Sequence, residues 1–292
     1  MIFQGLWKIE FSDIIGKKER GQNMFYELAF PGNKHKAVTF SYDDGQIYDR
    51  RLVEIFNKYG VKGTFHLNSD TIGKKGGGDE FVTWDEVANM YKGHEVSCHG
   101  FTHPFPLQIP KDQVTAQMFE DKKRLEEATC YPVRGMSYPY GEFSDEFIEV
   151  AKAVGMEYSR TVESTRSFNV PWDFMRWNPT CHHNDAMELV DEFLKPTWRG
   201  RNALFYIWGH SFEFDRENTW EMMEELVKKL SGKDNVWYAT NIEIKEYLDA
   251  GRALRTTANG KYVYNPSAIT VTILTVQGKY IDIPAGATVN ID

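Results

Sequence analysis

Residues 36–45 read KAVTFSYDDG, a β-branched and aromatic run that ends in two adjacent carboxylates and a glycine. The run predicts a strand over residues 36–42, with Asp43 and Asp44 directly after it. Two neighbouring aspartates repel each other, and neither is usual in a protein core. An ordinary turn accounts for such a pair as readily as a functional site does, so the rest of the chain has to decide between these interpretations.

Strands and helices alternate along most of the chain. Apolar residues at helical spacing, or a capping residue, predict helices at residues 48–59, 83–92, 111–129, 144–155, 186–195 and 219–230. Short apolar runs predict further strands at residues 61–67, 95–100, 136–138, 156–162 and 203–210. Alternation at these spacings is typical of βα units, so the sequence predicts an α/β fold with a parallel sheet.

The alternation stops near residue 250. The remaining sequence is rich in Val, Ile, Thr and Tyr and carries the turn signals NG, NP, QG and PAG, which predicts a few antiparallel strands. We therefore expect an N-terminal extension at residues 1–35 that packs on a main domain at 36–250, followed by a small β appendage at 251–292. A sugar-binding module, an oligomer contact and a lid are all open interpretations of the appendage.

The composition excludes some partners. The net charge is −8, from 34 basic and 42 acidic residues without a long basic run, so nucleic acids and anionic membranes are unexpected partners. The three cysteines form no CxxC spacing, which favours a reducing compartment over a disulfide scaffold. No export signal or membrane span occurs, which predicts a cytoplasmic protein, although a chain trimmed of its signal peptide would look the same. The oligomeric state is not predicted.

Polar residues follow several predicted strands at the point where each strand ends. They are Asp43 and Asp44, then His99 and His103, and finally His210, with a Pro-Tyr-Gly turn after the strand at 136–138. Because chemistry in parallel α/β folds gathers at the carboxyl ends of strands, we expect these side chains to meet on one face.

An aspartate and two histidines suit a divalent transition metal, zinc first and cobalt or nickel as alternatives. His99 and His103 are spaced to lie on one side of a helical turn or a tight loop. Three protein ligands leave positions open for water and substrate, as a catalytic metal site requires. One aspartate of the pair can then bind the metal while the other takes a proton from water.

Four motifs, in this order, resemble those of the polysaccharide deacetylase family, also called the NodB-homology family or carbohydrate esterase family 4. Residues 43–45 are similar to the end of TFDDG, 99–103 to HSxxH, 137–141 to RxPYG and 207–210 to LxxH. The resemblance covers residues 36 to 248 and implies a distorted (β/α) barrel with fewer than eight regular strands. It also implies metal-dependent hydrolysis of an N- or O-linked acetyl group on an oligo- or polysaccharide.

The resemblance assigns roles position by position. It implies Asp43 as the general base, His210 as the general acid, and the backbone N–H of Tyr140 as a donor to the oxyanion. It implies three metal ligands, namely Asp44, His99 and His103. We also expect substrate contacts from Tyr140, Trp172, Trp208 and His66.

Two motifs depart from the family pattern. The arginine of the third motif, which holds the base, is Ser137 here. We hypothesise that Arg160, at another strand end, supplies the missing cation to Asp43; a purely structural arginine is the alternative. The fourth motif, which supplies an aspartate near the acid histidine, has no clear match in this sequence. Asp173 is the local candidate, and it either orients His210 or is an ordinary loop acid.

Other interpretations stay open. His182 and His183 favour a polar loop over a substrate contact. The same site could hydrolyse a small non-sugar amide, which the missing export signal would suit. The departures at Ser137 and near Asp173 would also suit a non-catalytic carbohydrate-binding protein with a decayed site.

Overall fold

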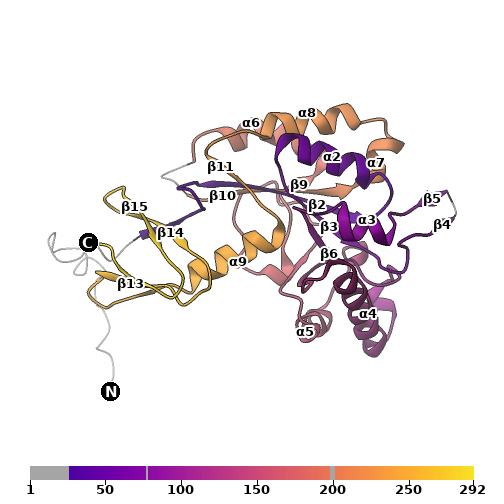
Figure 1. Ribbon diagram of the computed structural model, residues 1–292, viewed down its shortest axis with the longest axis horizontal. Coiled ribbons are helices and arrows are strands. Elements are labelled where there is room, and N and C mark those ends of the chain that lie inside the picture. The colour runs from indigo at the N-terminus through magenta and orange to yellow at the C-terminus, as the bar shows by residue number, and fades with distance from the viewer. Residues whose placement is uncertain (1–25, 77, 198–200) are drawn as a thin grey trace, which may run out of the picture. The chain divides into compact units, whose positions relative to one another are not determined.

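The computed structural model describes residues 26–76, 78–197 and 201–292, and these form two compact units (Figure 1). The larger unit spans Lys34–Glu246, and the smaller one combines residues 26–33 with residues 247–292. The expected boundary near residue 250 falls within the last helix, α9 (Asn241–Arg252).

The larger unit is built on one parallel sheet. Seven strands follow in the hydrogen-bonded order β8-β7-β6-β3-β2-β10-β9, and β11 pairs with the start of β2. Several strands have only two or three residues, so this curled half-barrel confirms the expected distorted barrel with fewer than eight regular strands. The strands are β2 (Lys36–Asp44), β3 (Gly63–Leu67), β6 (Glu95–Cys98), β7 (Gly135–Ser137), β8 (Tyr158–Arg160), β9 (Cys181–His182), β10 (Ala203–His210) and β11 (Val236–Tyr238).

Helices connect the strands and cover the sheet. Helices α2, α6 and α8 pack together, and α3, α4 and α5 form a second group (Figure 1). They are α2 (Asp49–Tyr59), α3 (Trp84–Asn89), α4 (Lys111–Thr129), α5 (Asp145–Val154), α6 (His183–Leu194), α7 (Ser211–Arg216) and α8 (Trp220–Leu230). A short hairpin of β4 (Lys75–Gly76) and β5 (Asp79–Glu80) occupies the glycine-rich loop. No described helix has the length and apolar content needed to cross a bilayer.

The register of the sheet aligns polar residues from separate strands. His210 of β10 is paired with Asp43 of β2, and Asp43 is in turn paired with His66 of β3. On β7 and β8, Ser137 is paired with Arg160. Before these positions the strands carry buried apolar side chains, such as Phe40 on β2 and Ile207 on β10. A shift of one residue would expose such side chains, so their burial fixes the register. Residues far apart in the sequence therefore reach the same end of the sheet.

The smaller unit consists of antiparallel strands, as expected for its C-terminal part. One sheet has the order β1-β14-β15 and the other β12-β13-β16, and Val263, Ile273, Ile283 and Ile291 form its core. The strands are β1 (Tyr26–Ala29), β12 (Arg255–Thr256), β13 (Tyr262–Tyr264), β14 (Val271–Thr275), β15 (Tyr280–Ile283) and β16 (Thr288–Asn290). The pairing of β1 with β14 was not expected from the sequence, and residues 1–25 of the expected extension lie outside the described residues.

Gly135 lets β7 lie against a large ring on the next strand. A Cβ atom at this position would lie 2.0 Å from Cζ of Tyr158. The ring cannot withdraw without loss, because its hydroxyl bonds to Glu95 at 2.7 Å and lies 3.0 Å from the Ser97 hydroxyl. The missing side chain therefore allows β7 to carry Ser137 to the strand end.

We expect Gly135→Ala to lower the free energy of unfolding by about 1–3 kcal/mol, because the new methyl group overpacks the core. Urea denaturation measures this change. Gly76→Ala is the matched control, since a Cβ there meets nothing within 4 Å. It should change stability by less than about 0.5 kcal/mol. Equal stability of the two variants would contradict this account of β7.

Candidate active site

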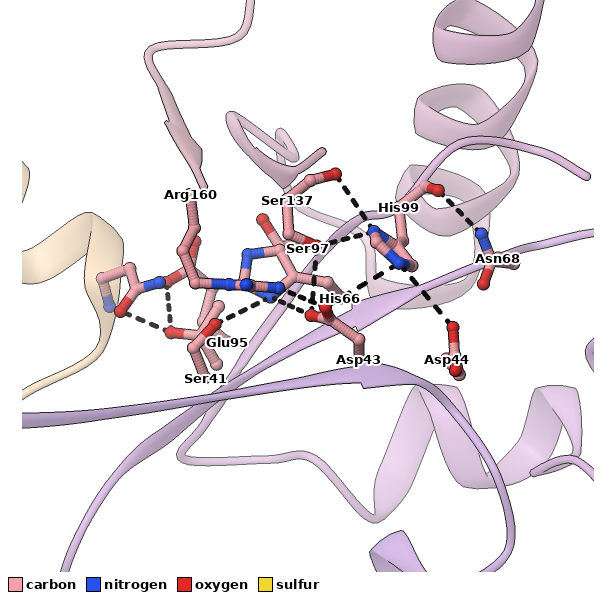
Figure 2. A network of polar contacts seen from close by, with 12 residues as sticks. Ser41, Asp43, Asp44, His66, Asn68, Glu95, Ser97, His99, Ser137 and Arg160 are labelled. Atoms are coloured by element: carbon pink, nitrogen blue, oxygen red, sulfur yellow. Dashed lines mark hydrogen bonds and ion pairs between the residues drawn. The ribbon is translucent and has the colours of Figure 1, made fainter. Parts of the chain in front are cut away.

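Asp43 lies in a buried network of polar side chains (Figure 2). The Ser137 hydroxyl donates to Asp43 Oδ1 at 3.1 Å, His66 Nδ1 lies 3.5 Å from the same oxygen, and the guanidinium of Arg160 pairs with Oδ2. Burial by itself raises the pKa of Asp43, but the positive charge of Arg160 and the nearby imidazoles outweigh it and hold this pKa far below its usual range. Asp43 is therefore ionised at neutral pH.

Arg160 occupies the position that the sequence analysis predicted for it, next to Asp43. Its side chain is completely buried, its Nη1 donates to the Thr161 carbonyl at 3.0 Å, and its guanidinium lies 4.4 Å from the centre of the Trp208 ring. Since Ser137 and Arg160 are paired on adjacent strands, the cation missing from the third motif comes from the neighbouring strand. Ser137 still contacts Asp43, as a neutral donor.

Asp44, His99 and His103 form a cluster beside Asp43. His99 Nε2 and His103 Nε2 are 3.1 Å apart, and Asp44 Oδ1 lies 3.7 and 3.9 Å from these two nitrogens. His99 Nδ1 lies 3.0 Å from the Ser137 carbonyl, so it carries the proton and leaves the Nε2 lone pair free to bind. Burial, followed by the proximity of His99, lowers the pKa of His103 to about 4. Two imidazoles and one carboxylate around a common point fit a divalent transition metal.

Two buried side chains that the sequence analysis missed fix the backbone of this cluster. Asp121 of α4 accepts the His99 N–H at 3.0 Å and the Ser69 N–H at 2.7 Å. The Asn68 amide donates to the carbonyls of His99 and Gly100 at 2.7 and 2.6 Å. A signal for Asp121 exists in the sequence, because it lies on the apolar face of its helix with Val114, Met118 and Leu125.

His210 is paired with Glu213, not with the carboxylate that the sequence analysis considered. Glu213 Oε2 lies 3.4 Å from His210 Nδ1. Asp173 instead accepts the Met175 N–H at 2.9 Å and pairs with Arg176 at 2.7 Å, which makes it the cap of a short turn. The interpretation of Asp173 as an ordinary loop acid therefore fits its contacts, and Glu213 is a candidate site residue that the motifs did not indicate.

The predicted substrate contacts divide into exposed and buried side chains. Tyr140, with a backbone φ of 56°, is half exposed and stacks on Phe105 at 3.9 Å. Trp172 is 87% exposed, and Trp208 is partly buried beside Arg160. His66 does not suit the predicted contact, because it is completely buried. Burial also lowers its pKa well below the usual range, so it is a neutral neighbour of Asp43.

His182 and His183 do not form the polar loop that the sequence favoured. They stand at the end of β9 and the start of α6, and His183 is completely buried. His183 stacks on Tyr42 at a ring distance of 5.9 Å. Both imidazoles lie near Glu213.

Residues 31–159 match the family model "Polysaccharide deacetylase". This part of the chain is similar to the polysaccharide deacetylase family. The match includes Asp43, the cluster of Asp44, His99 and His103, and the Pro-Tyr-Gly turn, which confirms the resemblance seen in the motifs.

Similar proteins support the same family. YxkH of Bacillus subtilis, assigned to the polysaccharide deacetylases, is 25% identical over 130 residues, which cover 44% of this chain and 45% of that protein. The peptidoglycan deacetylase of Helicobacter pylori is 23% identical over 158 residues, which cover 53% of this chain and 50% of that protein. The aligned part of the chain thus spans about half the length of these curated relatives.

Solved structures share the fold. A Mycobacterium smegmatis protein assigned to the polysaccharide deacetylases has a TM-score of 0.57 and 19% identity, and the alignment covers 77% of this chain and 96% of that one. A Bacillus anthracis pseudoenzyme of carbohydrate esterase family 4, mutated to restore activity, has a TM-score of 0.50 and 20% identity. The alignment covers 73% of this chain and 68% of that one. These similarities support the distorted barrel.

The ion pair between Arg160 and Asp43 makes a stability prediction. Arg160→Met should lower the free energy of unfolding by about 3–5 kcal/mol, because it leaves a buried carboxylate without its counter-charge. Adding Asp43→Asn should recover part of this loss, since the uncompensated charge is then gone. Urea denaturation of the two variants measures both effects.

Arg176→Met is the control, because Arg176 pairs with Asp173 and Asp145 at the surface. An exposed pair contributes little, so this variant should stay close to the unaltered protein. If Arg160→Met were no less stable than Arg176→Met, the buried pair would not have the importance given to it here.

Proposed function

We propose that this protein is a metal-dependent hydrolase that removes N- or O-linked acetyl groups from a carbohydrate. The observation that carries the proposal is the position of Asp43. This ionised, buried carboxylate lies directly beside the cluster of Asp44, His99 and His103. His210 is next to Asp43 in the register of the sheet, so a proton acceptor, a cation site and a proton donor lie together.

The donor set suits zinc, and Asp44, His99 and His103 would hold the ion. A bound divalent cation lowers the pKa of water and polarises a carbonyl oxygen. The carbonyl of Ser137 fixes the tautomer of His99, and Asp121 fixes the backbone of His99. Such outer contacts keep the ligand atoms turned toward one point.

Asp43 is the proton acceptor in this proposal. Its carboxylate takes the proton of the water that attacks the acetyl carbonyl carbon. Ser137 and Arg160 hold the two oxygens, so the carboxylate keeps a fixed orientation during the transfer. A pKa far below the usual range makes Asp43 a weak base, so transfer of a proton to it would be easier from water that the proposed cation makes more acidic.

His210 is the proton donor. As the bond between the acetyl carbon and the sugar nitrogen or oxygen breaks, Nε2 of His210 gives its proton to the leaving atom, and acetate is the other product. The N–H of Tyr140 supplies a hydrogen bond to the negatively charged oxygen of the intermediate. The left-handed backbone at Tyr140, in the turn after β7, sets the direction of this N–H.

Exposed aromatic rings favour a sugar as the substrate. Tyr140 and Phe105 stack with their planes inclined by 5°, and the Tyr140 and His103 rings make a T-shaped contact with their centroids 4.4 Å apart. An exposed aromatic surface beside the proposed cation site offers a flat apolar platform for a pyranose ring. Trp172 is a second exposed ring that a longer chain could contact.

The proposal predicts release of acetate that depends on a divalent cation. Acetylated chitooligosaccharides and acetylated xylan, assayed with zinc, cobalt or nickel, should release acetate, and EDTA should abolish the release. His103→Asn should lower zinc affinity by about tenfold or more, since one ligand is weakened. Asparagine is chosen because it tolerates the φ of 53° at this position. Hydrolysis of small amides without release from any acetylated sugar would overturn the proposed substrate class.

Asp43→Asn separates the proposed base from the ligands. The variant should lower kcat by about 10²–10⁴-fold, because the proton acceptor is lost, while the protein still binds one equivalent of zinc. Acetate release and metal content are measured on the same preparation. Loss of the bound zinc in this variant would make Asp43 a ligand and contradict the assigned division of the two aspartates.

A further inference from the structure

The start of α7 determines where the Glu213 carboxylate lies. His210 ends β10 and directly precedes the helix, and Glu213 is the third helical residue. Glu213 Oε2 accepts the backbone N–H of His210 at 3.1 Å, which is the reverse contact of a capping box. Because this hydrogen bond holds the carboxylate next to His210, the same oxygen lies within 3.4 Å of His210 Nδ1.

Two further imidazoles lie around this carboxylate. His182 Nε2 and His183 Nε2 lie 3.1 and 3.6 Å from Glu213 Oε2. The Asn184 N–H donates to His182 Nδ1 at 3.4 Å, so Nδ1 is the acceptor and Nε2 carries the proton that points at Glu213. With this proton on Nε2, His182 donates to Glu213 and offers no Nε2 lone pair to a cation.

The backbone of β10 brings His183 close to the same point. Gly209 has no side chain, and a Cβ atom there would lie 2.0 Å from His183 Nδ1. The His183 ring also packs against Phe214 of α7 at 4.2 Å. Burial, followed by the proximity of His182, lowers the pKa of His183 to about 3, so this imidazole is neutral near Glu213.

The charges around His210 favour its protonated form. Burial by itself lowers the pKa of His210, but the contact with Glu213 and the charges of Asp43 and Asp44 outweigh it, and this pKa is raised. Glu213 stays ionised, because its contacts with His182 and His210 hold its pKa well below the usual range despite burial. The titratable and charged groups nearby are Glu213 and Arg216 of α7, His182 of β9, His183 of α6, Asp43 and Asp44 of β2, and Arg160 of β8 over the Trp208 ring.

We propose that Glu213 is the positioning residue of the proton donor, and this rests on the deacetylation proposed above. Its carboxylate keeps the Nδ1 proton of His210 in place and stabilises the imidazolium, so that Nε2 is the nitrogen that gives a proton to the leaving group. Glu213 keeps its charge throughout, and His210 returns to the imidazolium by taking a proton from solvent. This is the role that the sequence analysis considered for Asp173.

The test replaces Glu213 by glutamine, which still offers an oxygen to the His210 N–H but carries no charge. Glu213→Gln should lower the pKa of His210 by about one unit, because an opposite charge at this distance favours the protonated ring. NMR titration of the His210 imidazole in the absence of substrate measures this directly. The alkaline limb of the kcat/KM profile should move to lower pH by a similar amount, and kcat should fall with little change in KM.

Glu217→Gln is the matched control, because Glu217 pairs with Arg216 at the surface one turn further along the chain. It should leave both the titration and the pH profile as they are. In the unaltered protein, His210 should titrate above about 6.5, the usual value for histidine. This measurement stays informative even if Glu213→Gln fails to fold, and a lower value would overturn the proposal.

The other outcomes are also decisive. An unchanged His210 pKa in Glu213→Gln overturns the positioning role whether or not the protein releases acetate. A shifted pKa in a protein that releases no acetate supports the pairing and overturns deacetylation alone. If Glu213→Gln lost a second equivalent of bound zinc, Glu213 would be a metal ligand. If Asp173→Asn, and not Glu213→Gln, shifted the pKa of His210, the positioning role would belong to Asp173. Either result overturns the proposal.

Discussion

The buried charge of Asp43 is the constraint on which the rest of the site depends. An ionised carboxylate at 3% exposure is costly unless a counter-charge and hydrogen bonds compensate it. Arg160 supplies the counter-charge, but it is itself completely buried and needs the Thr161 carbonyl and the face of Trp208. The packing of β7, β8 and β10 follows from this requirement, because these strands carry Ser137, Arg160 and Trp208 to the same place.

The two adjacent aspartates avoid repulsion by entering different surroundings. Successive side chains of a strand point to opposite faces, and the chain turns at Asp44, whose φ is 78°. Asp43 therefore reaches the arginine in the interior, while Asp44 stays partly exposed beside two imidazoles. A stretch that looks electrostatically unfavourable in the sequence thus places the proposed base and a proposed metal ligand one peptide bond apart.

The sequence predicted the parallel sheet and the group of residues at its carboxyl end, because periodicity and strand-end motifs are local signals. It could also suggest Arg160, since a missing arginine leaves a charge that needs a partner. It failed for contacts decided by helix starts and long-range pairing. Glu213 becomes a candidate partner of His210, in place of Asp173, only once the start of α7 is known. The register of β3 shows that His66 is a buried neighbour of Asp43 and does not line a pocket. Tyr26 pairs with Thr275, which lies far away in the sequence.

Three positions of the site, Asp44, His103 and Tyr140, have left-handed backbone conformations that suit glycine best. Each non-glycine residue there carries a conformational penalty of about 1–3 kcal/mol, which the surrounding fold must offset. Selection for thermal robustness alone would thus favour glycine at these positions, at the expense of ligands and aromatic contacts. Related proteins that no longer need catalytic activity would be expected to lose these side chains early. The folding stability of their barrels would then increase.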